Sequence, residues 1–201
     1  MIGNNDKEFL VFGRKFSYIQ QSSDSAHIGE RTIEVPIAKR WLDFYGKQIV
    51  EVGAVMPYWM QPEEVKHLVV DPYDPYDKGL KEDAENFTFL KLNVLSISTI
   101  EHIGLTEYGN PNSDIEKANR VLLKIITEAQ NYLITLPLGY NLSLDKYTET
   151  LPTTVRKFML VQTRADNRLE MAEVSINHKY NSPYKYANGV LFLTNTLEWV
   201  L

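Results

Sequence analysis

The segment from Gln48 to Trp59 (QIVEVGAVMPYW) constrains the fold of this chain more than any other part of the sequence. Apolar, β-branched residues flank Glu51 and lead directly into Gly53, a pattern that favours a strand followed by a sharp turn. A second apolar run, His67 to Val70, ends at Asp71. Strand, glycine turn, short crossover, strand and acid is the order of a nucleotide-binding βαβ half, in which the acid accepts hydrogen bonds from a ribose.

The composition limits the classes of function. The chain has 201 residues, 44% of them hydrophobic, which suits one domain over residues 1–201, with residues 1–30 as an irregular lead-in. Within this lead-in, Phe9 to Phe12 and Phe16 to Ile19 are candidates for short strands or a flap. A net charge of -5 gives no basic surface for nucleic acid, and the absence of cysteine excludes disulfides, metal-thiolate sites and cysteine nucleophiles. No apolar run approaches the roughly 20 residues of a membrane helix and no signal peptide is recognisable, so we expect a cytoplasmic protein without a membrane partner.

Helical spacing of apolar residues predicts two helices. Pro36 suits the first turn of one helix, and the apolar residues that follow share one face until Gly46 ends it. Ser113 and Glu116 form a capping box, and a continuous apolar face runs from there to Ala129. A third, very short helix is expected to begin at residue 62.

Strand-like runs fill much of the remaining chain. They are Ile49 to Val52, His67 to Val70, Phe87 to Ser98 (its second half a buried central strand), Tyr132 to Leu136, Phe158 to Thr163, Met171 to Ile176 and Val190 to Thr194. A turn at residues 165–167 joins two of them into a hairpin. Strands and helices alternate early and strands cluster late, which predicts an α/β fold with a mostly parallel central sheet, helices on both faces and an antiparallel C-terminal hairpin.

Polar residues converge on one edge of this predicted sheet. Gly53, Asp71 and the segments Ser98 to His102 and Pro137 to Asn141 all follow strands. In open α/β sheets, ligands bind outside the carboxyl ends of the strands, where the strand order reverses. The residues themselves therefore predict a ligand site at this edge.

Several short motifs also occur in a fixed order from Glu30 to the end of the chain: ERTIEVP, IVEVGAV, VVDPY, LSISTIEHIG, TLPLGYN and SPYKYANG. Together they resemble a family of small S-adenosylmethionine-dependent methyltransferases of the Rossmann-like class, often associated with polysaccharide or surface-glycan genes. SISTIEHIG is the most specific motif, whereas IVEVG and VVD are shared by the wider class. The resemblance implies a seven-stranded Rossmann-like methyltransferase sheet whose last strand is antiparallel, with S-adenosyl-L-methionine as cofactor.

The resemblance further implies a cofactor-binding role for the residues that follow each strand. The backbone at Gly53 would pass under the methionine part of the cofactor, and Asp71 would hold the ribose hydroxyls. An acid in the KEDAENF segment, Asp83, would lie near the adenine. The implied cofactor-binding residues are Glu51, Gly53, Ala54, Asp71, Asp83, Ser98 and Thr99.

His102 is the expected catalytic base, with Glu101 as its partner. Methyl transfer from a sulfonium depends mainly on proximity and alignment, but an oxygen acceptor must also lose a proton to a histidine or carboxylate. Glu101 would orient His102 or bind the cofactor amine. The alternative is that both residues only cap the loop after the strand. The histidines lack metal-ligand spacing, so no metal site is expected.

The acceptor is expected to be a small polar molecule, such as a sugar or glycan hydroxyl. Aromatic faces and amides suit polar rings, so the expected substrate-binding residues are Tyr140, Asn141, Tyr184 and Tyr186. The alternative for each tyrosine is ordinary packing in a surface loop. A homodimer is left open.

Two other functions remain open at this point. Only one glycine marks the cofactor loop, since Ala54 and Val55 follow Gly53, and the chain between Asp71 and Leu92 is short for a third strand and its helix. Both features fit a degenerate, non-catalytic methyltransferase-like protein that binds a partner. A nicotinamide-dependent oxidoreductase is less favoured, because its fingerprint needs the glycines that are missing here.

Overall fold

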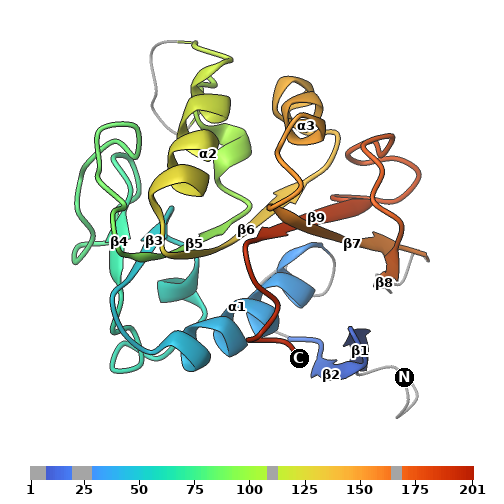
Figure 1. Cartoon of the computed structure of the whole chain (residues 1–201), viewed down its shortest axis with the longest axis horizontal. Coiled ribbons are helices and arrows are strands. Elements are labelled where there is room, and N and C mark those ends of the chain that lie inside the picture. Colours follow the sequence, from blue (N-terminus) through green and yellow to red (C-terminus); the bar gives the residue numbers. More distant parts are fainter. Residues whose placement is uncertain (1–7, 20–28, 108–112, 164–168) are drawn as a thin grey trace.

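The structure is a computed structural model, and it describes residues 8–19, 29–107, 113–163 and 169–201 (Figure 1). Strands and helices alternate along much of the chain, and the strand pairs are both parallel and antiparallel. The elements are β1 (Glu8–Val11), β2 (Arg14–Ser17), α1 (Arg31–Tyr45), β3 (Ile49–Val52), the 3₁₀ helix η1 (Met56–Tyr58), β4 (Leu68–Val70), β5 (Asn93–Ile97), the 3₁₀ helix η2 (Ile100–His102), α2 (Lys117–Glu128), β6 (Asn131–Pro137), α3 (Leu142–Glu149), β7 (Arg156–Gln162), β8 (Leu169–Ala172) and β9 (Gly189–Thr194).

The main sheet has seven strands in the order β4-β3-β5-β6-β9-β7-β8. The first four strands of this order are parallel, with Val50 of β3 opposite Val94 of β5, and Val94 opposite Tyr132 of β6. Strand β9 then pairs antiparallel with both β6 and β7, and β7 pairs antiparallel with β8. The carboxyl ends of β3, β4 and β5 therefore lie at one edge of the sheet.

The expectation of a Rossmann-like methyltransferase fold with a mostly parallel central sheet is wrong. The main sheet has three parallel and three antiparallel pairings, and the described residues contain only three α-helices beside it and a separate two-stranded sheet. The physical reason lies in the connections. The β3–β4 and β4–β5 segments carry paired prolines (Pro57 and Pro62, then Pro72 and Pro75) and form turns and one 3₁₀ helix in place of crossover α-helices.

Helices cover both faces of the sheet (Figure 1). On one face, α1 packs with the β1–β2 hairpin in a core that includes Trp41, Phe9 and Phe192. On the other face, α2 and α3 pack in a second core that includes Leu122 and Leu144. The hairpin pairs Phe9 with Phe16, so the two candidate segments of the lead-in form short strands. No helix in the described part of the chain is long and apolar enough to cross a bilayer.

Helix α1 begins one turn earlier than its proline indicates. Pro36 lies inside the helix, not in its first turn. A proline there cannot donate to the carbonyl four residues earlier, which belongs to Thr32. Ile19 supplies the missing donor, since its N–H lies 3.1 Å from that carbonyl oxygen. The helix ends as expected at Gly46, whose φ of 64° is a left-handed value.

Candidate functional site

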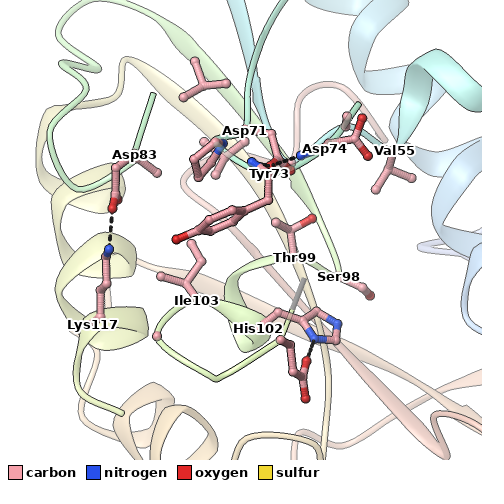
Figure 2. Close-up of a pocket in the computed structure, with 18 of the residues that line it drawn as sticks. Val55, Asp71, Tyr73, Asp74, Asp83, Ser98, Thr99, His102, Ile103 and Lys117 are labelled. Carbon is pink, nitrogen blue, oxygen red and sulfur yellow. Dashed lines mark hydrogen bonds and ion pairs between the residues drawn. The ribbon is translucent and has the colours of Figure 1, made fainter. Parts of the chain in front are cut away.

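A cavity of about 380 Å³ opens at the carboxyl ends of β3, β4 and β5 (Figure 2). Its walls come from the loops that follow these strands and from the first residues of α1 and α2. The lining includes seven of the residues expected from the sequence: Gly53, Ala54, Asp71, Asp83, Ser98, Thr99 and His102. The predicted sheet edge is thus a real concave site, although the sheet around it is mixed.

Gly53 allows the loop after β3 to pass against the loop after β5. Its φ is +86°, and a Cβ at this position would lie 2.2 Å from Oγ1 of Thr99. Its N–H donates to the carbonyl of Val70 at 3.0 Å, which ties the loop to the end of β4. A side chain at position 53 would therefore clash with Thr99 and adopt a strained backbone.

Glu51 supports the cavity from behind and does not line it. Its side chain is fully buried, and Oε1 accepts hydrogen bonds from the N–H groups of Val55 (2.9 Å) and Met56 (2.8 Å). Its other oxygen lies 2.7 Å from Nε2 of His67. The carboxylate thus fixes the course of the Gly53–Val55 loop, a supporting role where direct cofactor contact was expected.

Asp71 shapes the loop after β4. Its Oδ1 accepts from the N–H groups of Tyr73 (2.8 Å) and Asp74 (2.9 Å), a short turn of the kind aspartate favours (Figure 2). Asp74 in turn accepts a hydrogen bond from the hydroxyl of Tyr58 at 2.7 Å, and this bond helps to raise the pKa of Tyr58 to about 12. Among the described residues, no hydrogen bond engages Oδ2 of Asp71.

Asp83 occupies another wall, at the N-terminal end of α2. Its Oδ2 forms an ion pair with Lys117, and its Oδ1 accepts from the N–H of Glu85 at 3.0 Å (Figure 2). Lys117 therefore belongs to the site, although nothing in the sequence singled it out. The expected adenine-side acid is in the cavity, but it is already paired with a cation.

A buried polar network fixes the end of β5. Oγ of Ser98, whose φ is 36°, donates to Glu34 at 2.5 Å. The guanidinium of Arg31 pairs with Glu34 at 2.6 Å and donates to the carbonyl of Ser98 at 3.3 Å. Arg31 also lines the cavity, so the first turn of α1 contributes a cation that sequence reasoning missed.

Glu101 and His102 lie together on η2 but in different environments. Glu101 is 2% exposed and does not line the cavity, and burial raises the pKa of its carboxyl well above the ordinary value. Its side chain makes no hydrogen bond among the described residues, and Oε1 lies 3.5 Å from Nε2 of His102. His102 itself faces the cavity.

Glu107 is the third residue of the site that sequence reasoning missed, after Lys117 and Arg31. Its Oε2 lies 2.6 Å from Nδ1 of His102, and its two oxygens each accept from the hydroxyl of Tyr140 at 2.9 Å. The Tyr140 ring packs edge-on against the His102 ring, with centroids 4.5 Å apart. No local sequence pattern predicts a role for Glu107, because it lies in the irregular loop after η2.

The structure does not bring the four expected substrate-binding residues together in one site. Tyr140 contacts His102, but Asn141 is the N-cap of α3, where its side chain accepts from the N–H of Leu144 at 3.1 Å. The hydroxyl of Tyr184 donates to the carbonyl of Thr163 at 3.2 Å, and the N–H of Tyr186 donates to a side chain in its own loop. None of the four lines the cavity.

The charges of the cavity favour a cationic ligand. Four carboxylates line it, those of Asp71, Asp74, Asp83 and Glu107, against two cations, Arg31 and Lys117. This formal excess of negative charge would repel a diphosphate and attract a positive centre.

Comparison with known proteins adds little to this geometry. No protein-family model matches the chain, and no curated protein matches it significantly. One solved structure, titled "Structure of the Pnkp1/Rnl/Hen1 RNA repair complex", matches with 9% sequence identity and a TM-score of 0.40. The match covers 90% of this chain and 43% of that chain, so this chain spans less than half the length of the protein it matches. A likeness this distant supports no statement about the fold or function of this chain.

Proposed function

We propose that this protein is an S-adenosylmethionine-dependent methyltransferase that acts on a small polar acceptor, such as a sugar hydroxyl. The observation that carries the proposal is the open cavity of about 380 Å³ between Gly53 and Asp71. Its size falls within the range of pockets that hold small molecules and cofactors. The ordered sequence motifs supply the chemical identity of the ligand.

The residues of the cavity fit the parts of such a cofactor. Oδ2 of Asp71 is suited to accept hydrogen bonds from the ribose hydroxyls, since Oδ1 already accepts from two backbone N–H groups. Gly53 has no side chain, so the cofactor would be able to approach its backbone closely. The guanidinium of Arg31 would bind the carboxylate of the cofactor's methionine part. When bound, the cofactor supplies an electrophilic methyl group on a positively charged sulfur, which the acidic lining favours.

His102 is the group that would accept a proton from the acceptor. It lies at the end of the cavity away from the Asp83–Lys117 ion pair (Figure 2). A histidine at such a position can act as a general base near neutral pH. The chain would otherwise contribute mainly by holding acceptor and donor in line.

Two rival functions are less well supported. A binding-only protein would be favoured if side chains filled the cleft, whereas the cavity is open. A nicotinamide-dependent oxidoreductase would place a dianionic diphosphate beside an excess of carboxylates, in a loop with one glycine.

Titration of the purified protein with S-adenosylhomocysteine tests the proposal. We expect saturable binding by calorimetry, and a ligand at about 100 times its Kd would add about 2.7 kcal/mol to the free energy of unfolding. For a chain of this size, that corresponds to a rise in Tm of roughly 5–10 °C. NADH at the same concentration is the control. Absence of heat and of a thermal shift at millimolar S-adenosylhomocysteine, or tighter binding of NADH, would overturn the proposal.

A further inference from the structure

A second cavity, of about 320 Å³, opens at the opposite edge of the sheet, where β3 and β4 begin. Its lining comes from the C-terminal half of α1, from Ile49 at the start of β3, and from Lys66 and His67 just before β4. The described residues that line it are all different from those that line the first cavity. The proposed methyl transfer therefore gives this second cavity no role.

His67 contributes a buried ring to this second cavity. Its side chain is 4% exposed, and Nε2 lies 2.7 Å from Oε2 of Glu51. A carboxylate can only accept a hydrogen bond, so Nε2 carries a proton. Among the described residues, no hydrogen bond engages the other ring nitrogen, Nδ1, which is a lone pair in the neutral ring and a second donor in the protonated ring. Polar groups of buried side chains usually have a partner, so Nδ1 marks the point at which a ligand would bind.

The charges around the ring favour an anionic ligand. Three ammonium groups and two carboxylates line the second cavity, those of Lys39, Lys47, Lys66, Asp43 and Glu64. One of each already pairs, with Nζ of Lys39 3.5 Å from Oε1 of Glu64. The remaining charges are two cations and one anion, to which a protonated His67 adds a third cation. An anion would gain both a charge-assisted hydrogen bond from Nδ1 and the attraction of the lysines, whereas a neutral hydroxyl would gain only a hydrogen bond.

Other features of the second cavity favour a single charge on an apolar body. The carbonyl end of α1 carries a partial negative charge and, together with Asp43, would repel a multiply charged ion. Three apolar side chains, those of Leu42, Ile49 and Met60, also line the cavity. Its volume of about 320 Å³ suits a small organic molecule and exceeds what a bare inorganic ion would fill.

We propose that the second cavity binds a small monocarboxylic acid, and that the protonated ring of His67 donates to its carboxylate from Nδ1. Glu51, on the other side of the ring, stabilises the imidazolium. The carboxylate and one proton therefore bind together. Glu51 also accepts from the N–H groups of Val55 and Met56 in the loop of the first cavity, so a continuous chain of contacts joins the two cavities.

Nitrogen NMR of the full chain tests the role of the ring, because ¹⁵N shifts report which imidazole nitrogen carries a proton. From about pH 5 to pH 9, Nδ1 of His67, assigned with a His67→Gln variant, should lose its proton while Nε2 keeps its own. Saturating butyrate should move the midpoint of this loss to higher pH, since it binds the protonated ring. His178, which lies outside both cavities, is the internal reference, and sodium chloride of equal ionic strength controls for screening.

A matched set of small molecules tests the class of ligand. Butyrate, acetate, 1-butanol and butylamine differ in charge or chain length, and none of them titrates between about pH 6 and pH 8. Butyrate should bind roughly 10- to 15-fold more tightly than acetate, because two further CH₂ groups are buried. The alcohol and the amine should bind about tenfold or more weakly than butyrate, since neither accepts a charge-assisted hydrogen bond from Nδ1. The affinity for butyrate should fall by up to about tenfold per pH unit as His67 loses its proton.

Variants separate this site from a general effect of charge. His67→Gln can still donate to Glu51 but has no counterpart of Nδ1, so butyrate should bind roughly 10- to 150-fold more weakly and with little pH dependence. Lys66→Gln should weaken binding about two- to fivefold. Lys78→Gln is the matched control, because this lysine is exposed and lies outside both cavities, and it should leave binding unchanged. Urea denaturation checks that each variant is folded.

Butyrate binding that moves with the protonation of Nδ1 would support the proposed site. An Nδ1 midpoint that tens of millimolar butyrate leaves unchanged, or 1-butanol that binds as tightly as butyrate, would overturn it. Equal effects of Lys66→Gln and Lys78→Gln would also count against it, because butyrate would then respond only to the overall charge. None of these measurements uses S-adenosylhomocysteine, so failure of the proposed methyltransferase function would leave this inference standing, and the reverse holds as well.

Discussion

Gly53 and Thr99 come so close that any Cβ at position 53 would lie 2.2 Å from Oγ1 of Thr99. This contact joins the loops after β3 and β5 and sets the shape of the cavity between them. We expect Gly53→Ala to lower the free energy of unfolding by about 1–2 kcal/mol through its positive φ and by about 1–3 kcal/mol more through the clash. Urea denaturation measures the loss.

Gly46→Ala is the matched control for this variant. Gly46 also has a positive φ, +64°, but a Cβ there would meet nothing within 4 Å. The Gly46→Ala variant should therefore lose only the free energy of unfolding that the positive φ costs. It should bind S-adenosylhomocysteine as the wild type does. Equal losses in the two variants would show that the contact with Thr99 is unimportant.

Glu51 is expected to stabilise the protein by holding the cavity loop. Glu51→Ala leaves the N–H groups of Val55 and Met56 and the ring of His67 without their partner, which should cost about 3–5 kcal/mol. Glu51→Gln keeps an oxygen for the two N–H groups and should cost about 1–2 kcal/mol. Chemical denaturation of both variants measures these values. If Glu51→Gln lowers the free energy of unfolding as much as Glu51→Ala does, the contact of Glu51 with His67 is its dominant interaction, and the hydrogen bonds to the loop are not.

Asp71 is expected to contribute to ligand binding through its charge. Asp71→Asn retains an oxygen for the N–H groups of Tyr73 and Asp74, so the turn should persist. Loss of the charged acceptor should weaken S-adenosylhomocysteine binding by about 1.5–3 kcal/mol, or roughly 10- to 150-fold in Kd. Asp77→Asn removes an equal charge from an exposed position in the same loop, outside the cavity lining, and should change Kd less than about twofold. Calorimetry compares the two, and similar effects would exclude a specific role for Asp71.

Asp145 is expected to make stability fall as pH rises through the weakly acidic range. Burial raises the pKa of this carboxyl from 3.8 to about 6, although Oδ2 accepts from the N–H of Gly139 at 2.8 Å. Between these values the native state binds more protons than the unfolded state, so the free energy of unfolding decreases with increasing pH. The loss amounts to at most about 3 kcal/mol between roughly pH 4 and pH 6.

Asp145→Asn keeps the size of the side chain and removes its titration. The difference in unfolding free energy between the variant and the wild type, measured by urea denaturation, should grow in favour of the variant from about pH 4 to pH 7. Using the difference cancels the titration of other carboxylates. A constant difference over this range would mean that Asp145 does not titrate with a raised pKa.

Local patterns predicted the elements whose ends are fixed by local chemistry. The strand at Ile49 to Val52 and the helix end at Gly46 are confirmed, because β-branched residues and a left-handed glycine act within a few residues. The expected strand from Phe87 shortens to Asn93–Ile97, since the N–H of Phe87 donates to the carbonyl of Asp83 in a turn. The expected helix at residues 62–64 is a turn.

Other predictions failed because distant residues compete with local ones. Ser113 and Glu116 do not form a capping box, since α2 begins at Lys117 and the side chain of Glu116 accepts hydrogen bonds from Asn119 and Ser143 instead. The C-terminal hairpin is confirmed as β7 and β8, although its second strand starts at Leu169, and its expected turn at residues 165–167 lies outside the described residues.

The sequence by itself determined which residues follow β3, β4 and β5, and hence that Gly53, Asp71 and Thr99 would meet at one edge. Side chains that follow neighbouring parallel strands are brought together by the pairing of the strands alone. Only the tertiary structure decided that half of the sheet pairings are antiparallel, that Glu51 supports the cavity from behind, and that Glu107 and Tyr140 hold His102. These depend on which loops pack together across long sequence separations, and no local propensity encodes that choice.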